Sequence, residues 1–215
     1  AWAVFAPLSA HAQAPYPSQS IRFVVPYAPG GLPDTVARIV GQHLQERVGQ
    51  SVVVENRAGG GAAAAVGALM GAPADGYTFI VTDGGIVSTN PALFKQLTYN
   101  PKDIIPVALL GRTPMFLASH PSLPASTLRE FVDYVRAHPG EINYGSSGVG
   151  SIHHLSMEAL KAALHLNMTH IPYRGTGQSV PALLGGHVQV IFAAYPSIAG
   201  AVDSKTIRLL AQNGE

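Results

Sequence analysis

The stretch that decides the fold is Ile21–Arg38, which reads IRFVVPYAPGGLPDTVAR. Four of its first five residues are apolar, as in a buried strand, and apolar residues recur at helical spacing from Val36 onward. A turn rich in proline and glycine lies between them. A strand that leads through a glycine turn into a helix predicts an anion site, because the first N–H groups of a helix lack internal partners and lie at the positive end of its dipole.

Asp34 stands at the start of this predicted helix. Its carboxylate is suited to cap the helix, to face a ligand across the turn, or to do both. An ordinary loop between a strand and a helix, capped by this aspartate, is the alternative reading of the stretch. The stretch alone does not separate these possibilities.

The composition is that of a globular chain of ordinary charge. The chain has 215 residues, enough for one large or two small domains, of which 47% are hydrophobic and 12% charged. Its formal net charge of +1 gives no reason to expect a nucleic acid or an anionic membrane surface as a partner. Because the chain has no cysteine, disulfides, thiolate chemistry and zinc sites that use sulfur are excluded.

Residues 1–14, AWAVFAPLSAHAQA, are similar to the end of a signal peptide. They are mostly apolar and small, and Ala10-His11-Ala12 has the small-x-small pattern of a cleavage site. We expect this segment to be a signal-peptide remnant of an exported protein that begins near Gln13 or Pro15. A short N-terminal strand or helix is the alternative.

Strands and helices are predicted to alternate after the first turn. Ser51–Glu55 and Tyr77–Thr82 have the apolar character of buried strands, and Ala62–Met70 between them is an alanine-rich helix. This order predicts a parallel sheet with right-handed crossovers. Further strands are expected at residues 106–111, 115–119, 143–144, 168–172, 188–192 and 207–211. Helices are expected at residues 127–138 and 152–166, and a third helix is expected to end at residue 184. Two α/β lobes of this kind place a cleft at the carboxyl ends of their strands.

A second turn, Gly145–Ser151, reads GSSGVGS and follows a short predicted strand. Its serine hydroxyls and the backbone N–H groups of Gly145, Gly148 and Gly150 lie where a helix begins, and together they provide several donors for a carboxylate. Arg174 is suited to add a charge-assisted hydrogen bond or to remain an ordinary surface arginine.

Enzyme and cofactor signatures are mostly unmet. Gly59–Gly61 follows a strand, but Ala64 breaks the G-x-G-x-x-G spacing, and no G-x-x-x-x-G-K-[ST] motif occurs. Gly145–Gly148 is only loosely similar to a nucleophile elbow, because the second glycine of G-x-S-x-G is missing. His153 and His154 are adjacent, whereas zinc-binding pairs on a helix are four residues apart. We therefore expect binding without catalysis, and neither a cofactor nor a metal.

Motifs of one family run along the chain from about Tyr16 to its end. They are Ile21–Tyr27, Pro29-Gly30-Gly31, Val52–Arg57, Asp75–Thr78, Asn90-Pro91, Asn143–Ser151, Pro172–Gly175 and Leu183–Gly186. With these motifs the chain resembles the substrate-binding proteins of the tripartite tricarboxylate transporter family, the Bug receptors. The resemblance implies an α/β fold of the two-lobed periplasmic binding protein class (type II-like), in which each lobe is a parallel-type sheet flanked by helices and the ligand lies between the lobes.

The resemblance also implies boundaries and a binding site. Residues 15–105 and 206–215 would form the first lobe and residues 106–205 the second, with hinges near residues 99–106 and 203–208. In such receptors backbone N–H groups and ordered waters in two turns hold the ligand's carboxylates. The implied ligand-binding residues are Tyr27, Ala28, Gly30, Gly31, Asp34, Thr82, Ser88, Ser146, Ser147, Gly148, Ser151, His154, Tyr173 and Gly175. We expect replacement of Asp34 by alanine to change ligand preference more than folding.

Three features depart from the family pattern. Ala193-Ala194 stands where relatives often carry an acidic or amide residue, which removes a polar ligand contact from that strand. Asp83 is an acid where relatives more often have small or hydroxyl residues. The chain also ends at Glu215, whereas relatives continue, so we expect it to be truncated at both ends and its first lobe to be incomplete at the C-terminus, with an unsatisfied sheet edge.

These inferences together predict a periplasmic receptor of a Gram-negative bacterium. It would be a monomer that captures a small carboxylate (a di- or tricarboxylate, an acidic amino acid or an aromatic carboxylate) for the membrane components of a tripartite tricarboxylate-type transporter. One alternative is a sensor that presents its ligand to a membrane signalling protein. The other is a serine-dependent α/β hydrolase that uses Ser147.

Overall fold

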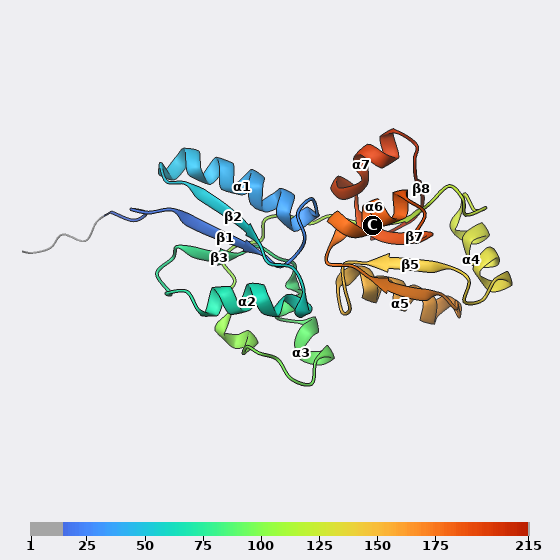
Figure 1. Cartoon of the computed structure of the whole chain (residues 1–215), viewed down its shortest axis with the longest axis horizontal. Helices are drawn as coiled ribbons and strands as arrows, with labels where there is room; N and C mark the ends of the chain where they lie inside the picture. The colour runs from blue at the N-terminus through green and yellow to red at the C-terminus, as the bar shows by residue number, and fades with distance from the viewer. Residues whose placement is uncertain (1–14, 215) are drawn as a thin grey trace, which may run out of the picture.

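The computed structural model describes residues 15–214, which form two lobes, each with its own sheet and helices (Figure 1). The first lobe is coloured blue to green and the second yellow to red. The predicted signal-peptide remnant, residues 1–14, lies outside the described residues. The α/β class and the division into two lobes are confirmed.

The first lobe is built on three parallel strands in the order β2-β1-β3. The strands are β1 (Ile21–Val25), β2 (Val52–Asn56) and β3 (Thr78–Ile80). Helix α1 (Leu32–Val48) and helix α2 (Ala63–Met70) lie on opposite faces of this sheet (Figure 1). Because the strands are parallel, the turns that follow them emerge at one edge, where ligands of open α/β sheets bind.

Short elements follow β2 and β3 at this edge of the first lobe. They are the 3-10 helices η1 (Gly60–Ala62), η2 (Gly84–Ile86) and η3 (Pro101–Asp103), and the five-residue helix α3 (Thr89–Leu93). Tyr99 ties two of them together, because its hydroxyl donates to Ile86 O at 2.8 Å and accepts from Asn90 Nδ2 at 3.0 Å. Tyr99 thereby holds η2 and α3, which both follow β3, against each other.

The second lobe has a five-stranded sheet in the order β6-β5-β7-β4-β8. Its strands are β4 (Met115–Ser119), β5 (Asn143–Ser146), β6 (Thr169–Pro172), β7 (Val190–Ala194) and β8 (Arg208–Asn213). β5, β6 and β7 are parallel, whereas β4 runs antiparallel to both of its neighbours. This sheet is therefore mixed rather than wholly parallel.

Helices cover both faces of the second sheet. They are α4 (Leu128–Ala137), α5 (Ile152–Leu164), α6 (Thr176–Leu184) and α7 (Tyr195–Asp203). Strand β7 is buried along its whole length: Val190 and Phe192 join the core formed with α4 and α5, while Ile191 and Ala193 join the core formed with α6 and α7. Alternation along a strand with two apolar faces is what a sheet covered on both sides requires.

The structure corrects three predictions about the connections. Residues 106–111 form no strand, and Ile105, Val107 and Leu109 are 81%, 76% and 72% exposed, because no described strand pairs with them. Strand β8 pairs with β4, so it lies in the second sheet and has not returned to the first lobe. The segment near residues 203–208 therefore joins two elements of one lobe and is not a hinge between lobes.

Candidate functional site

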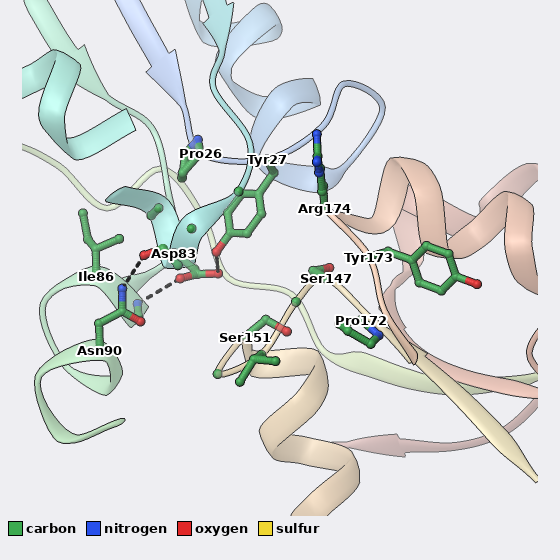
Figure 2. Close-up of a pocket in the computed structure, with 18 of the residues that line it drawn as sticks. Pro26, Tyr27, Asp83, Ile86, Asn90, Ser147, Ser151, Pro172, Tyr173 and Arg174 are labelled. Atoms are coloured by element: carbon green, nitrogen blue, oxygen red, sulfur yellow. Dashed lines mark hydrogen bonds between the residues drawn. The ribbon is translucent and has the colours of Figure 1, made fainter. Parts of the chain in front are cut away.

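A cleft of about 400 Å³ lies between the two lobes. The first lobe contributes the loops after β1, β2 and β3, and the second lobe contributes the loops after β5 and β6. These loops follow the carboxyl ends of parallel strands in both sheets, which is the position predicted for the ligand. Figure 2 shows the cleft with Tyr27 and Asp83 of the first lobe opposite Ser147 and Ser151 of the second.

The turn after β2 forms one wall of the cleft. Four consecutive residues, Gly59 to Ala62, have φ angles of 112°, 58°, 60° and 75°. Glycine tolerates this left-handed region, whereas alanine adopts it rarely, so the conformation of Ala62 must be held by its surroundings. Asn90 supplies one restraint, because its side-chain amide donates to Gly61 O at 2.8 Å. Helix α2 begins directly after this turn.

Asp83 and Tyr27 form a second wall of the cleft. The Tyr27 hydroxyl donates to Asp83 Oδ2 at 2.6 Å, and the Gly85 N–H donates to Asp83 Oδ1 at 2.9 Å. Burial, and then the negative charge of Asp83, raise the pKa of Tyr27 well above its usual value. The tyrosine is therefore neutral and remains a donor, and it fixes the carboxylate in one orientation (Figure 2).

The second lobe supplies the turn between β5 and α5. Ser151 caps the helix by accepting from the His154 N–H, and it lines the cleft together with Ser147 and Gly148. Ser147 is 7% exposed and its hydroxyl has no hydrogen-bond partner in the structure. A buried hydroxyl without a partner is costly, which makes Ser147 the polar group in this wall that most needs a ligand or a water.

The N–H groups of Gly148 and Gly150 in this turn are not available to a ligand, contrary to the prediction. The Gly148 N–H donates to Ser146 Oγ at 3.0 Å, and the Gly150 N–H donates to His154 Nδ1 at 3.2 Å. Both donors are thus used inside the turn and are not presented to a ligand. Gly150 has a different role, because a Cβ there would lie 2.2 Å from Leu93 of the first lobe. Glycine at this position lets the two lobes approach closely.

A stack of three aromatic rings, from Tyr144, His170 and His154, packs next to the same turn. The His154 ring lies 4.1 Å from the His170 ring, which lies 4.8 Å from the Tyr144 ring. His170 Nε2 is 2.6 Å from Ser146 Oγ. Burial is the main cause that lowers the pKa of His154, and it also lowers the pKa of His170 to about 4. Both rings are therefore neutral near pH 7, and they position the turn without lining the cleft.

The first glycine turn does not line the cleft, contrary to the prediction. Residues 28–31 pack against the start of α6 in the other lobe, where the Ala28 N–H donates to Arg174 O at 2.9 Å. A Cβ on Gly31 would lie 2.7 Å from Thr176 Oγ1, and a Cβ on Gly177 would lie 1.9 Å from Pro29 O. These glycines therefore permit contact between the two lobes. They do not face Ser146–Gly148 across a gap.

Asp34 is also directed into the protein. It is 3% exposed, and its carboxylate accepts hydrogen bonds from the Gly30 N–H, the Asn56 amide and the Arg38 guanidinium. Burial by itself would raise the pKa of Asp34, but these donors outweigh it, and the pKa is lowered. The N-cap of α1 is Gly31, so Asp34 neither occupies the cap position nor reaches the cleft.

The structure thus divides the predicted site. It brings Tyr27, Ser147, Gly148, Ser151 and Tyr173 to the cleft. The residues that do not line it are Ala28, Gly30, Gly31, Asp34, Thr82, Ser88, Ser146, His154 and Gly175. Four of these nine residues, Ala28, Thr82, Ser146 and Gly175, stand next to a lining residue in the chain, so the sequence predicts the loops better than the individual contacts.

The wall formed by Gly59–Ala62 is absent from the predicted set. This glycine run does not have the spacing of a dinucleotide-binding loop. It does, however, follow β2, which runs parallel to β1. Its position at the common carboxyl edge is therefore a usable signal for a ligand site. Asp83 carries the same signal after β3, whereas Asn90 has none beyond its place in a family motif.

In residues 15–214 no group of three or more histidine, cysteine, aspartate or glutamate side chains is arranged to hold a metal ion. No helix in the same part of the chain combines the length and the apolar character that crossing a membrane requires.

Comparisons with known proteins agree with this architecture. Residues 36–215 match the family described as tripartite tricarboxylate transporter family receptor. The protein BugT of Bordetella pertussis is 33% identical over 210 residues, which are 97% of this chain and 64% of BugT. The chain spans 57% of another curated relative from the same organism, so it covers less than two thirds of these relatives.

Two solved structures are similar along nearly the whole chain. An R. palustris protein with adipate superposes with a TM-score of 0.89 at 34% identity, covering 92% of this chain and 66% of that one. MatC from Rhodopseudomonas palustris, with bound malate, gives a TM-score of 0.87 at 32% identity over 93% of this chain and 68% of that one. Two further similar structures are described as a periplasmic transporter and as the periplasmic binding protein BugD, so these homologues are solute-binding proteins rather than enzymes. The chain therefore belongs to the tripartite tricarboxylate transporter receptor family, the family of the Bug proteins.

Proposed function

We propose that this protein is a periplasmic receptor that captures a small carboxylate in the cleft between its lobes for a tripartite tricarboxylate-type transporter. The observation that carries the proposal is the hydroxyl of Ser147, which is buried, lines the cleft and lacks a partner. The relatives solved with adipate and malate support a carboxylate as the ligand class.

The binding step would use the hydroxyl of Ser147, which lies in the turn before α5. A carboxylate oxygen in front of Ser147 would accept its hydroxyl hydrogen and would lie near the N-terminus of that helix, whose dipole favours negative charge. The cleft volume of about 400 Å³ lies within the range of small-molecule sites. No step requires catalysis, since binding and release are sufficient for a receptor.

Closure of the lobes over the ligand is the second part of the proposal. The segment at residues 104–114 has no regular structure and joins the two lobes, which suits a hinge. In the structure the lobes already touch where Ala28 donates to Arg174 O and where Leu93 lies over Gly150. A ligand that bridges both walls would favour this closed arrangement over an open one.

Isothermal titration calorimetry with malate and adipate tests the proposal. We expect saturable binding by the wild type and a loss of affinity of about tenfold in Ser147→Ala, since one hydrogen bond to a charged group contributes about 1.5 kcal/mol. Ser119→Ala is the matched control, because Ser119 is also buried with an unpartnered hydroxyl but lies on β4 outside the cleft. Failure of every small carboxylate to bind the wild type, or equal losses in both variants, would contradict the proposal.

A further inference from the structure

The cleft that is proposed to bind an anion also contains a carboxylate of the protein. We propose that Asp83 makes this receptor selective for ligands that carry a cationic nitrogen in addition to their carboxylate, such as amino acids, over plain dicarboxylates. The inference rests on the proposed function, and it adds the chemical class of the ligand.

The cleft leaves the charge of Asp83 without a cationic partner. Among the lining residues only Asp83 and Arg174 are charged, and Arg174 is an exposed residue whose side chain points away from Asp83 and Ser147 in Figure 2. None of the ion pairs found within residues 15–214 includes Asp83. His153 on α5 is close enough for the charge of Asp83 to act on it, but burial lowers the pKa of His153 to about 4, so this ring is neutral near pH 7.

The hydrogen bonds of Asp83 orient its carboxylate and leave part of it free. Oδ2 accepts from the Tyr27 hydroxyl and Oδ1 accepts from the Gly85 N–H. A carboxylate offers about four acceptor positions, so roughly two remain for a ligand. Since Tyr27 and the start of η2 hold the group in place, a cation in the cleft would meet a preformed acceptor.

The two lobes therefore present groups of opposite preference to the cleft: one side favours a negative charge and the other a positive charge. Ser147 provides a hydroxyl donor on the second lobe, in the turn before α5, and Asp83 provides a negatively charged acceptor on the first lobe. A dicarboxylate that spans the cleft would place its second carboxylate near Asp83, where like charges repel in a partly desolvated site. A ligand with an ammonium group at that end would be attracted instead.

Calorimetry with matched ligand pairs tests the inference on the purified protein. Aspartate carries an ammonium group where malate carries a hydroxyl, and 6-aminohexanoate carries a CH2NH3+ group where adipate carries its second carboxylate. We expect the wild type to bind the ammonium-bearing member of at least one pair ten or more times more tightly than its partner. In Asp83→Asn, which keeps the shape of the side chain, we expect this preference to disappear or to reverse.

Asp133→Asn provides the control, because it removes the same charge from an exposed position on α4, away from the cleft. Its ligand preference should equal that of the wild type. If the wild type binds malate and adipate more tightly than their ammonium-bearing partners, the inference is overturned while the receptor function stays intact. The same holds if Asp83→Asn keeps the ligand preference and the melting temperature of the wild type. If no member of either pair binds, the inference and the proposed function both fail.

Discussion

Asp34 holds together the turn between β1 and α1. Replacing it by alanine would leave the Gly30 N–H and the Asn56 amide without their buried acceptor, and it would break the 2.9 Å ion pair with Arg38. We expect the free energy of unfolding to fall by about 2 to 4 kcal/mol. Ligand preference should stay unchanged, because Asp34 does not line the cleft. Urea denaturation and calorimetry on the same preparation measure the two quantities.

The loss of stability in Asp34→Ala should depend on pH in a definite direction. The donors lower the pKa of Asp34 below its ordinary value of 3.8, so its stabilising contribution is complete above that pH and is lost as the pH falls through the lowered pKa. The difference between the wild type and Asp34→Ala should therefore narrow in strong acid. Asp133→Ala, at an exposed position, should change stability by less than about 0.5 kcal/mol. A stable Asp34→Ala protein with altered ligand preference would show that the carboxylate faces the ligand.

At the scale of elements, the turn between β5 and α5 depends on neutral histidines. Burial, and then the charge of His154, lower the pKa of His170 to about 4, so the unfolded chain binds more protons than the folded one between pH 4 and 6.5. Glu158 and Lys161 also face this stack, through Tyr144. Stability should therefore rise with pH across this range, by about 1 kcal/mol for His170 after allowance for solvent screening.

The variant His170→Asn tests this dependence. We expect thermal denaturation between pH 4 and 7 to show a flatter rise in stability for this variant than for the wild type, since the titrating ring is gone. His43→Asn, on the exposed face of α1, should keep the wild-type slope. An identical slope in His170→Asn would mean that the stack does not control the acid sensitivity of the turn.

The elements also show which features a sequence can predict. Local rules predict β1, α1, α4 and α5, because apolar periodicity and capping residues are encoded within each segment. The Thr127 hydroxyl accepts from the Glu130 N–H at the start of α4, where the predicted helix at residues 127–138 begins. Residues 106–111 have the composition of a strand but no described partner, and a strand forms only when another strand pairs with it.

At the scale of the whole molecule, the positions of the lobes decide which turn meets the ligand. Each glycine turn has the same local signature, yet residues 28–31 pack against α6 while residues 59–62 line the cleft. That difference arises from contacts between segments more than a hundred residues apart, such as the hydrogen bond from Ala28 to Arg174, and no local pattern encodes it. The sequence therefore predicts the edge of the sheet that binds, but not the residues that touch the ligand.

The central claim is that a carboxylate binds between the two walls of this cleft. A crystal structure of the protein grown with aspartate tests it most directly. We expect a carboxylate oxygen within hydrogen-bonding distance of Ser147 Oγ and an ammonium group directed at Asp83. Aspartate bound instead at the turn of Gly30 and Gly31, or a cleft that stays empty of ligand at saturating aspartate and malate, would contradict it.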